Sequence, residues 1–147
     1  MCSSDLIAAR ATLAGAEGGC QAEVGAASAM AAAALCYLKG GTPAACAAAA
    51  AMALGNLLGL VCDPVAGLVE VPCVKRNASG VAGAFVAAEL ALAGIGSVIP
   101  PDEAILAMKR VGDAMHPALK ETAEGGLAAT PTACRLQHEL LGRDAWQ

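Results

Sequence analysis

The segment Thr42–Leu60, TPAACAAAAAMALGNLLGL, decides the fold class of this chain. Thr42 suits a helix N-cap and Pro43 suits the first helical position, so the pattern predicts that a helix starts here. Alanine is the strongest helix former, and the segment carries no charge. These features predict a helix that runs to about Leu60 and is buried on all sides, within an all-α protein.

The flanking sequence predicts more helices and gives only weak strand signals. The Ala-rich residues 21–38 predict a helix that Gly40-Gly41 ends, and residues 7–19 predict a helix end and a turn before Cys20. The segment between Asp63 and Pro72 is expected to be irregular. Further helices are expected at about 75–93, 101–115, 117–124 and 130–141. The expected architecture is an Ala/Gly-rich helical bundle.

The composition favours close helix packing and argues against nucleic acid as a partner. The 147 residues are 57% hydrophobic but only 2% aromatic, so small aliphatic residues carry the apolar content. The formal net charge is −4. Without a basic face or aromatic platforms, the chain lacks the features that grip phosphates and stack on bases.

The apolar content raises one alternative, a small membrane or helix-packing protein without a metal. Residues 44–62 are uncharged over nearly the length that crosses a bilayer. They are mostly alanine, however, rather than the larger residues that favour insertion, and no Trp or Tyr belt flanks them. A helix buried in a bundle explains the segment better, and no membrane partner is expected.

The seven cysteines suggest metal ligands or packed thiols rather than disulfides. Their number is odd and no secretory leader precedes them, which favours a reducing, cytoplasmic compartment. Cys20, Cys62 and Cys73 have Gly or Pro neighbours, so we expect them at helix ends or in loops, where metal ligands can converge. Cys36 and Cys46 lie in Ala-rich runs and are expected to be core thiols.

Three blocks of sequence resemble the iron–sulfur-dependent L-serine dehydratases, in the C-terminal half of their catalytic alpha chain. They are GAEGGCQAEVG at 15–25, NLLGLVCDPVAGLVEVPC at 56–73 followed by KRNA at 75–78, and ETAEGGLA at 121–128. The resemblance covers about residues 13–131, and CDPVAGLVEVPC is its most specific part.

The resemblance implies that Cys20, Cys62 and Cys73 hold three irons of a [4Fe–4S] cluster. The fourth iron is then open and serves as a Lewis acid. In this family it is expected to bind the hydroxyl group of L-serine. Loss of the α-proton and the hydroxyl gives aminoacrylate, which hydrolyses to pyruvate and ammonia without pyridoxal phosphate.

The resemblance identifies no catalytic base. Arg76 is predicted to pair with the substrate carboxylate, and a structural arginine at a helix start is the equal alternative. Asn77 is predicted either to contact the substrate or to cap a helix. Glu23 is expected to support the site or to be solvated. Cys134 is a candidate ligand of the fourth iron, but more residues follow it, so that a packed or surface thiol is favoured.

The sequence is expected to be part of a longer protein. Met1–Leu6 can be encoded by DNA that matches the end of a common sequencing adapter, so we expect residues 1–6 to be an artefact. Residues 7–147 are then the C-terminal part of the alpha domain. The resemblance implies a separate N-terminal half, a beta subunit or domain, assembly into an oligomer, and little activity for this chain alone. A cluster-binding subunit without turnover is the remaining alternative.

Overall fold

A computed structural model describes residues 3–142, and over this range the fold is helical, with no strand and one isolated bridge. The α-helices are α1 (Ser3–Arg10), α2 (Gly15–Gly18), α3 (Ala26–Leu38), α4 (Pro43–Gly55), α5 (Cys73–Leu92), α6 (Pro101–Ala114) and α7 (Pro131–Leu141). A π-helical turn spans Gln21–Gly25, and 3-10 turns span Val65–Gly67, Pro117–Leu119 and Gly126–Ala129. The predicted all-α class is confirmed.

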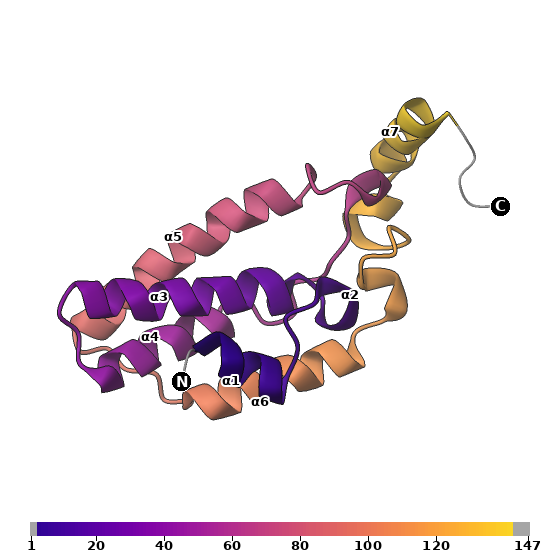
Figure 1. Ribbon diagram of the computed structural model, residues 1–147. Helices are drawn as coiled ribbons and strands as arrows, with labels where there is room; N and C mark the ends of the chain where they lie inside the picture. Colours follow the sequence, from indigo (N-terminus) through magenta and orange to yellow (C-terminus); the bar gives the residue numbers. More distant parts are fainter. Residues whose placement is uncertain (1–2, 143–147) are drawn as a thin grey trace.

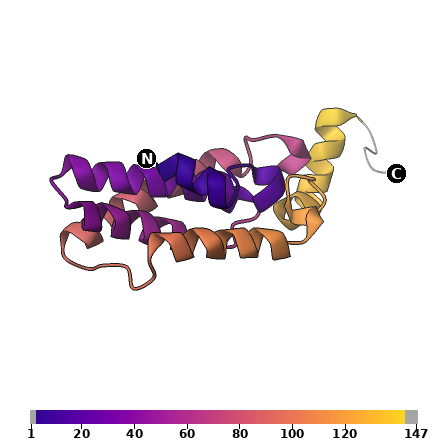
Figure 2. The same ribbon diagram turned by 60° about the horizontal axis from the view of Figure 1, so that its bottom comes forward.

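Helices α3, α4 and α5 pack against one another in the centre of the bundle, and α6 lies along α4 (Figure 1). The segments after residue 117, including α7, lie at one end of the bundle, on the side of α2. The view turned by 60° shows the same arrangement (Figure 2). No helix within residues 3–142 has both the length and the apolar content needed to cross a membrane.

The centre of the bundle is built almost entirely from alanine. Where α3, α4 and α5 meet, the fully buried side chains are Ala32, Cys36, Ala49, Ala53, Ala84, Ala87 and Ala88. Small side chains let the helix backbones approach closely, and the Ser28 hydroxyl of α3 donates to the Gly80 carbonyl of α5 at 2.7 Å. A β-carbon on Gly80 would lie 2.8 Å from Val24, so this crossing requires glycine.

Overpacking this interface is expected to destabilise the protein. Replacing Ala84 with leucine adds volume where the side chain is fully buried, which should lower the free energy of unfolding by about 1–3 kcal/mol. Ala82 lies on the exposed side of the same helix, so Ala82→Leu should change it by less than about 0.5 kcal/mol. Urea unfolding of both variants measures the difference; equal losses would contradict a tightly packed interface.

A second core joins α1 and α6 to α3 and α4. Its buried residues are Ile7, Ala26, Ala29, Ala51, Leu54, Ala104, Ile105 and Met108, and Leu6 packs against them partly buried. Ser3–Leu6 therefore form the first part of α1. Met1 and Cys2 lie outside the described residues, and the interpretation of residues 1–6 as an artefact stays a prediction.

The helix predicted over 42–60 begins as expected but ends at Gly55. The Thr42 hydroxyl accepts a hydrogen bond from the Ala45 N–H, which confirms the N-cap. After Gly55 the chain turns, and Gly59 has a φ of +83°. The Gly59 N–H donates to Oε1 of Gln21 at 3.0 Å, so a contact distant in sequence takes the chain out of the helix.

The helix predicted over 117–124 is wrong, because only Pro117–Leu119 form a 3-10 turn. Lys120 forms a parallel bridge with Cys62 instead, and Glu121 and Ala123 have φ values of +67° and +58°. These left-handed backbone conformations cannot continue a right-handed helix. Pairing with the Cys62 segment thus replaces the local helical hydrogen bonds.

Two other helix starts differ from prediction. The helix predicted over 21–38 begins with the π-helical turn Gln21–Gly25, a local widening that is frequent at functional sites. The helix predicted from about 75 starts at Cys73. Asn77 therefore lies inside α5, and its predicted alternative role as an N-cap is wrong.

Candidate metal centre

Cys20 is placed by a glycine turn at the end of α2. Gly19 has a φ of +77°, and a β-carbon there would lie 2.8 Å from both the Leu60 carbonyl oxygen and the Met115 sulfur. The Gln21 N–H donates to the Leu60 carbonyl at 2.9 Å, which fixes the start of the π-helical turn against the segment before Cys62. The Cys20 side chain is 1% exposed.

Cys62 and Cys73 lie at the two ends of an irregular loop. The Cys62 N–H donates to the Leu119 carbonyl at 2.9 Å, and its carbonyl accepts from the Glu121 N–H at 2.8 Å. The Val65 N–H donates to the Val71 carbonyl at 2.9 Å, which closes the loop and returns the chain towards Cys62. Cys73 then becomes the first residue of α5.

The structure brings two of the three predicted ligands, Cys20 and Cys62, together with Glu23. One ligand atom from each of Cys20, Glu23 and Cys62 lies within 4.8 Å of the others. Cys73 lies outside this group, but it is near enough to Cys20 and Arg76 for both to affect the pKa of its thiol. Glu23 therefore joins the cysteines at this site, with its side chain exposed to solvent.

Burial disfavours ionisation of the Cys62 and Cys73 thiols by raising their pKa. Burial raises the pKa of Cys62, and the adjacent Cys20 thiol raises it further. The pKa of Cys73 is raised by burial and by Cys20, while the Arg76 charge opposes the rise. Binding a metal as thiolates would therefore release protons. Burial also raises the pKa of Cys36, so it is the convergence of the thiols that distinguishes the site.

A buried ion pair lies directly beside Cys20. Nη1 of Arg76 lies 2.6 Å from Oδ1 of Asp63 and 2.7 Å from the Val61 carbonyl oxygen, and it lies 3.8 Å from the Cys20 sulfur. The side chain of Asp63 is 2% exposed and that of Arg76 is 17% exposed. Oδ2 of Asp63 accepts a further hydrogen bond from the Leu127 N–H at 2.6 Å. The pair thus ties three segments together.

The remaining predicted site residues lie apart from this group. Asn77 is exposed on the next position of α5. Cys134 lies on α7, and its thiol donates to the Ala128 carbonyl at 3.9 Å. Cys36 and Cys46 interact with each other between α3 and α4, as expected for core thiols. Substrate binding by Arg76 and Asn77 and ligation by Cys134 stay predictions.

Gly126 is required where the chain crosses the Asp63 carboxylate. Its φ is +59°, and a β-carbon would lie 2.2 Å from Oδ2 of Asp63. Gly126→Ala is therefore expected to lower the free energy of unfolding by more than about 1 kcal/mol. Gly55→Ala, at a glycine with no atom near its β-carbon position, should change it by less than about 0.5 kcal/mol. Urea unfolding compares the two, and similar values would contradict the close approach.

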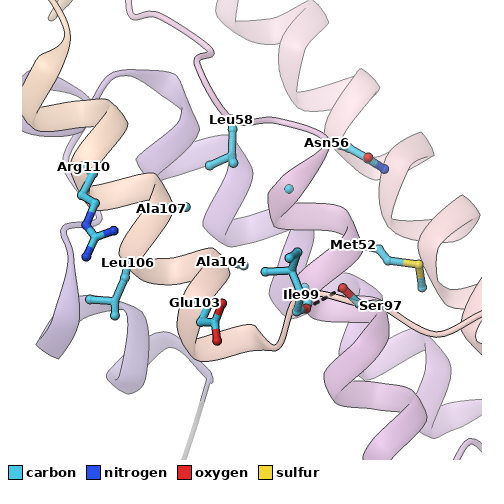
Figure 3. Close-up of a pocket in the computed structure, with 12 residues that line it drawn as sticks. Met52, Asn56, Leu58, Ser97, Ile99, Glu103, Ala104, Leu106, Ala107 and Arg110 are labelled. Atoms are coloured by element: carbon cyan, nitrogen blue, oxygen red, sulfur yellow. Dashed lines mark hydrogen bonds between the residues drawn. The ribbon is translucent and has the colours of Figure 1, made fainter.

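A groove on the described surface lies elsewhere. This groove of about 610 Å³ lies between α4 and α6 and is lined by apolar side chains such as Met52, Leu58 and Ile99 (Figure 3). Glu103 and Arg110 supply charge from α6. None of its lining residues is a cysteine or another predicted site residue, so the groove is separate from the thiol site.

The donor set fits a thiolate-bound metal group. Soft thiolate ligands select zinc, Cu(I) and iron–sulfur clusters, and three thiols from three backbone directions match a cluster held by three cysteines. Sequence reasoning missed Gln21, whose buried amide joins the carbonyls of Gly18 and Met108 to the Gly59 N–H. The available signal for Gln21 was its position, since it is a polar residue directly after Cys20 at the start of an apolar run.

The fold and the site together define an all-helical protein with a buried thiol site at one end of the bundle. The family model for the serine dehydratase alpha chain matches residues 3–128. The chain therefore belongs to the serine dehydratase alpha chain family, as its sequence blocks predict. This membership argues against the alternative of a small membrane or helix-packing protein.

Curated relatives carry matching names. The chain is 60% identical over 137 residues to "Probable L-serine dehydratase, alpha chain" of Bacillus subtilis, covering 93% of this chain and 46% of the relative. It is 55% identical to "L-serine dehydratase, alpha chain" of Peptoniphilus asaccharolyticus, covering 89% and 45%. It is also 49% identical to "L-serine dehydratase" of Mycobacterium bovis, covering 81% and 26%. The chain thus spans about half the length of these two alpha chains.

Proposed function

We propose that this chain provides the cluster-binding part of an L-serine ammonia-lyase, which converts L-serine to pyruvate and ammonia. The observation that carries the proposal is that Cys20 and Cys62 meet beside Glu23, with Cys73 near Cys20, taken with membership of the serine dehydratase alpha chain family. The cofactor proposed is a [4Fe–4S] cluster held by these three cysteines. When bound, it would supply an open iron that acts as a Lewis acid on the serine hydroxyl.

The residues of this chain have positioning and shielding roles in the proposal. Cys20 and Cys62 lie in a dry site, since both are almost fully buried. Glu23 and Glu121 bring negative charge close to Cys62, and Arg76 brings positive charge close to Cys20 and Cys73. Glu23 is exposed beside the thiols, where it can contact an incoming group. The catalytic base is proposed to lie in the portion of the relatives that this chain does not span.

The active assembly is proposed to need more than this chain. The relatives named as alpha chains imply a partner chain, and this chain covers 46% and 45% of two of them. We therefore propose a beta subunit or domain, the missing N-terminal half, and an oligomeric enzyme in the cytoplasm. The chain alone is expected to have little activity. The span 7–147 is proposed to be the C-terminal part of the catalytic domain.

The test is to reconstitute the chain anaerobically with iron and sulfide and to measure both per chain. Serine-dependent pyruvate formation is then measured with and without the missing half and the beta subunit of a relative. A cluster together with pyruvate formation in the completed assembly is the expected result. A cluster without turnover in that assembly would favour a structural subunit, and the absence of bound iron and sulfide would contradict the cofactor assignment.

A further inference from the structure

We propose that Arg76, held by Asp63, is a positioning residue for Cys20, whose sulfur it contacts and whose negative charge it balances in the bound state. This inference rests on the proposed function, because it concerns Cys20 as a cluster ligand. In this proposal Arg76 contacts the cluster ligand Cys20 rather than the substrate carboxylate. Asp63 is the group that orients the guanidinium.

A single nitrogen of Arg76 makes three contacts at this site. Nη1 of Arg76 bonds to Asp63 and to the Val61 carbonyl at 2.6 and 2.7 Å, and these two short contacts hold it 3.8 Å from the Cys20 sulfur. A guanidinium is a permanent cation that only donates hydrogen bonds. A negatively charged sulfur at 3.8 Å therefore interacts favourably with this cation.

The burial of Cys20 makes such a partner necessary. A thiolate in a site that is 1% exposed has lost its hydration, and an uncompensated buried charge is costly. Arg76, whose Nη1 lies 3.8 Å from the Cys20 sulfur, is the cation placed to balance that charge.

Asp63 fixes the guanidinium because the carboxylate is itself fixed. Its second oxygen accepts the Leu127 N–H at 2.6 Å, and the chain passes so close at Gly126 that a β-carbon would lie 2.2 Å away. The carboxylate therefore has little room to move. Because Asp63 directly follows the ligand Cys62 in the chain, the pair couples two proposed ligands through one ion pair.

This geometry has a consequence for the cluster that a purely structural arginine would not have. Hydrogen bonds to cluster sulfurs and nearby charges set the reduction potential of a cluster. A cation beside a ligand sulfur stabilises the reduced form, which carries one more negative charge. Removing the cation is therefore expected to move the midpoint potential to a more negative value.

The experiment compares Arg76→Gln and Arg76→Lys with the unchanged chain and with Lys75→Gln. Lys75 is exposed on the same helix, so this control removes the same charge without the contact to Cys20. Each protein is reconstituted anaerobically, its iron and sulfide are counted, and the midpoint potential is measured by reductive titration followed by electron paramagnetic resonance. Melting of each protein before reconstitution reports on its fold.

The expected result is a more negative potential in Arg76→Gln, partial recovery in Arg76→Lys, and no change in Lys75→Gln. Loss of the cluster from Arg76→Gln with recovery in Arg76→Lys also supports the inference. An unchanged potential in Arg76→Gln, or equal loss of fold and cluster in both Arg76 variants, overturns it and leaves the proposed function standing. Absence of a cluster in the unchanged chain overturns both.

Discussion

Iron and acid-labile sulfide are expected to fall from about four of each per chain to near zero when Cys62 is replaced with alanine. With a single thiolate gone from a three-cysteine site, two protein ligands remain to hold the cluster. The neighbouring carboxylate of Glu23 is a hard donor and a poor replacement for sulfur. Anaerobic reconstitution followed by iron and sulfide analysis measures the loss.

Cys46→Ala is the matched control for this prediction. Cys46 is partly buried in the Ala-rich helix α4, and it lies against Cys36 rather than the proposed ligands. This variant is expected to keep the full content of iron and sulfide. Full cluster content in Cys62→Ala, with helical circular dichroism like that of the unchanged chain, would exclude Cys62 as a ligand.

Asp63→Ala is expected to lower the free energy of unfolding by about 3–5 kcal/mol, the largest effect on stability that we predict. The substitution leaves the Arg76 cation, which is 17% exposed, without its carboxylate partner. It also removes the acceptor of the Leu127 N–H. The 3-10 turn Gly126–Ala129 then loses its attachment to the Cys62 segment, so that protection from hydrogen exchange should fall there first.

Asp113→Ala is the control for this substitution. Asp113 forms an ion pair with Lys109 at 2.8 Å, but both side chains are about half exposed or more, so the pair should contribute less than about 1 kcal/mol. Urea unfolding at neutral pH compares the two variants. Similar losses of stability in both would show that burial adds nothing to the Asp63–Arg76 pair.

The helices with strong local signals could be predicted from sequence. Helices α4 and α7 each start where a threonine hydroxyl caps a helix that begins with proline, and both caps form in the structure. Helix α6 also begins at its predicted proline, Pro101. Capping and the fixed φ of proline act within one turn, so neighbouring residues suffice to place these starts.

The segments that failed prediction are those whose backbone bonds to distant residues. The helix expected over 117–124 gives way to pairing between Lys120 and Cys62, and beyond the end of α4 at Gly55 the Gly59 N–H donates to Gln21. Local patterns carry no information about such partners. Both departures lie next to the thiol site, where contacts between distant segments replace regular helix.

The sequence by itself determined the helical class and, through its resemblance to a family, the candidate cysteines Cys20, Cys62 and Cys73. Only the tertiary structure decided that the ligand atoms of Cys20, Cys62 and Glu23 meet, and that Asp63 holds Arg76 beside the Cys20 sulfur. The physical reason is the separation in sequence of the groups that interact. Helix formation follows from hydrogen bonds between near neighbours, whereas a buried site needs side chains from distant segments to compensate one another's charge.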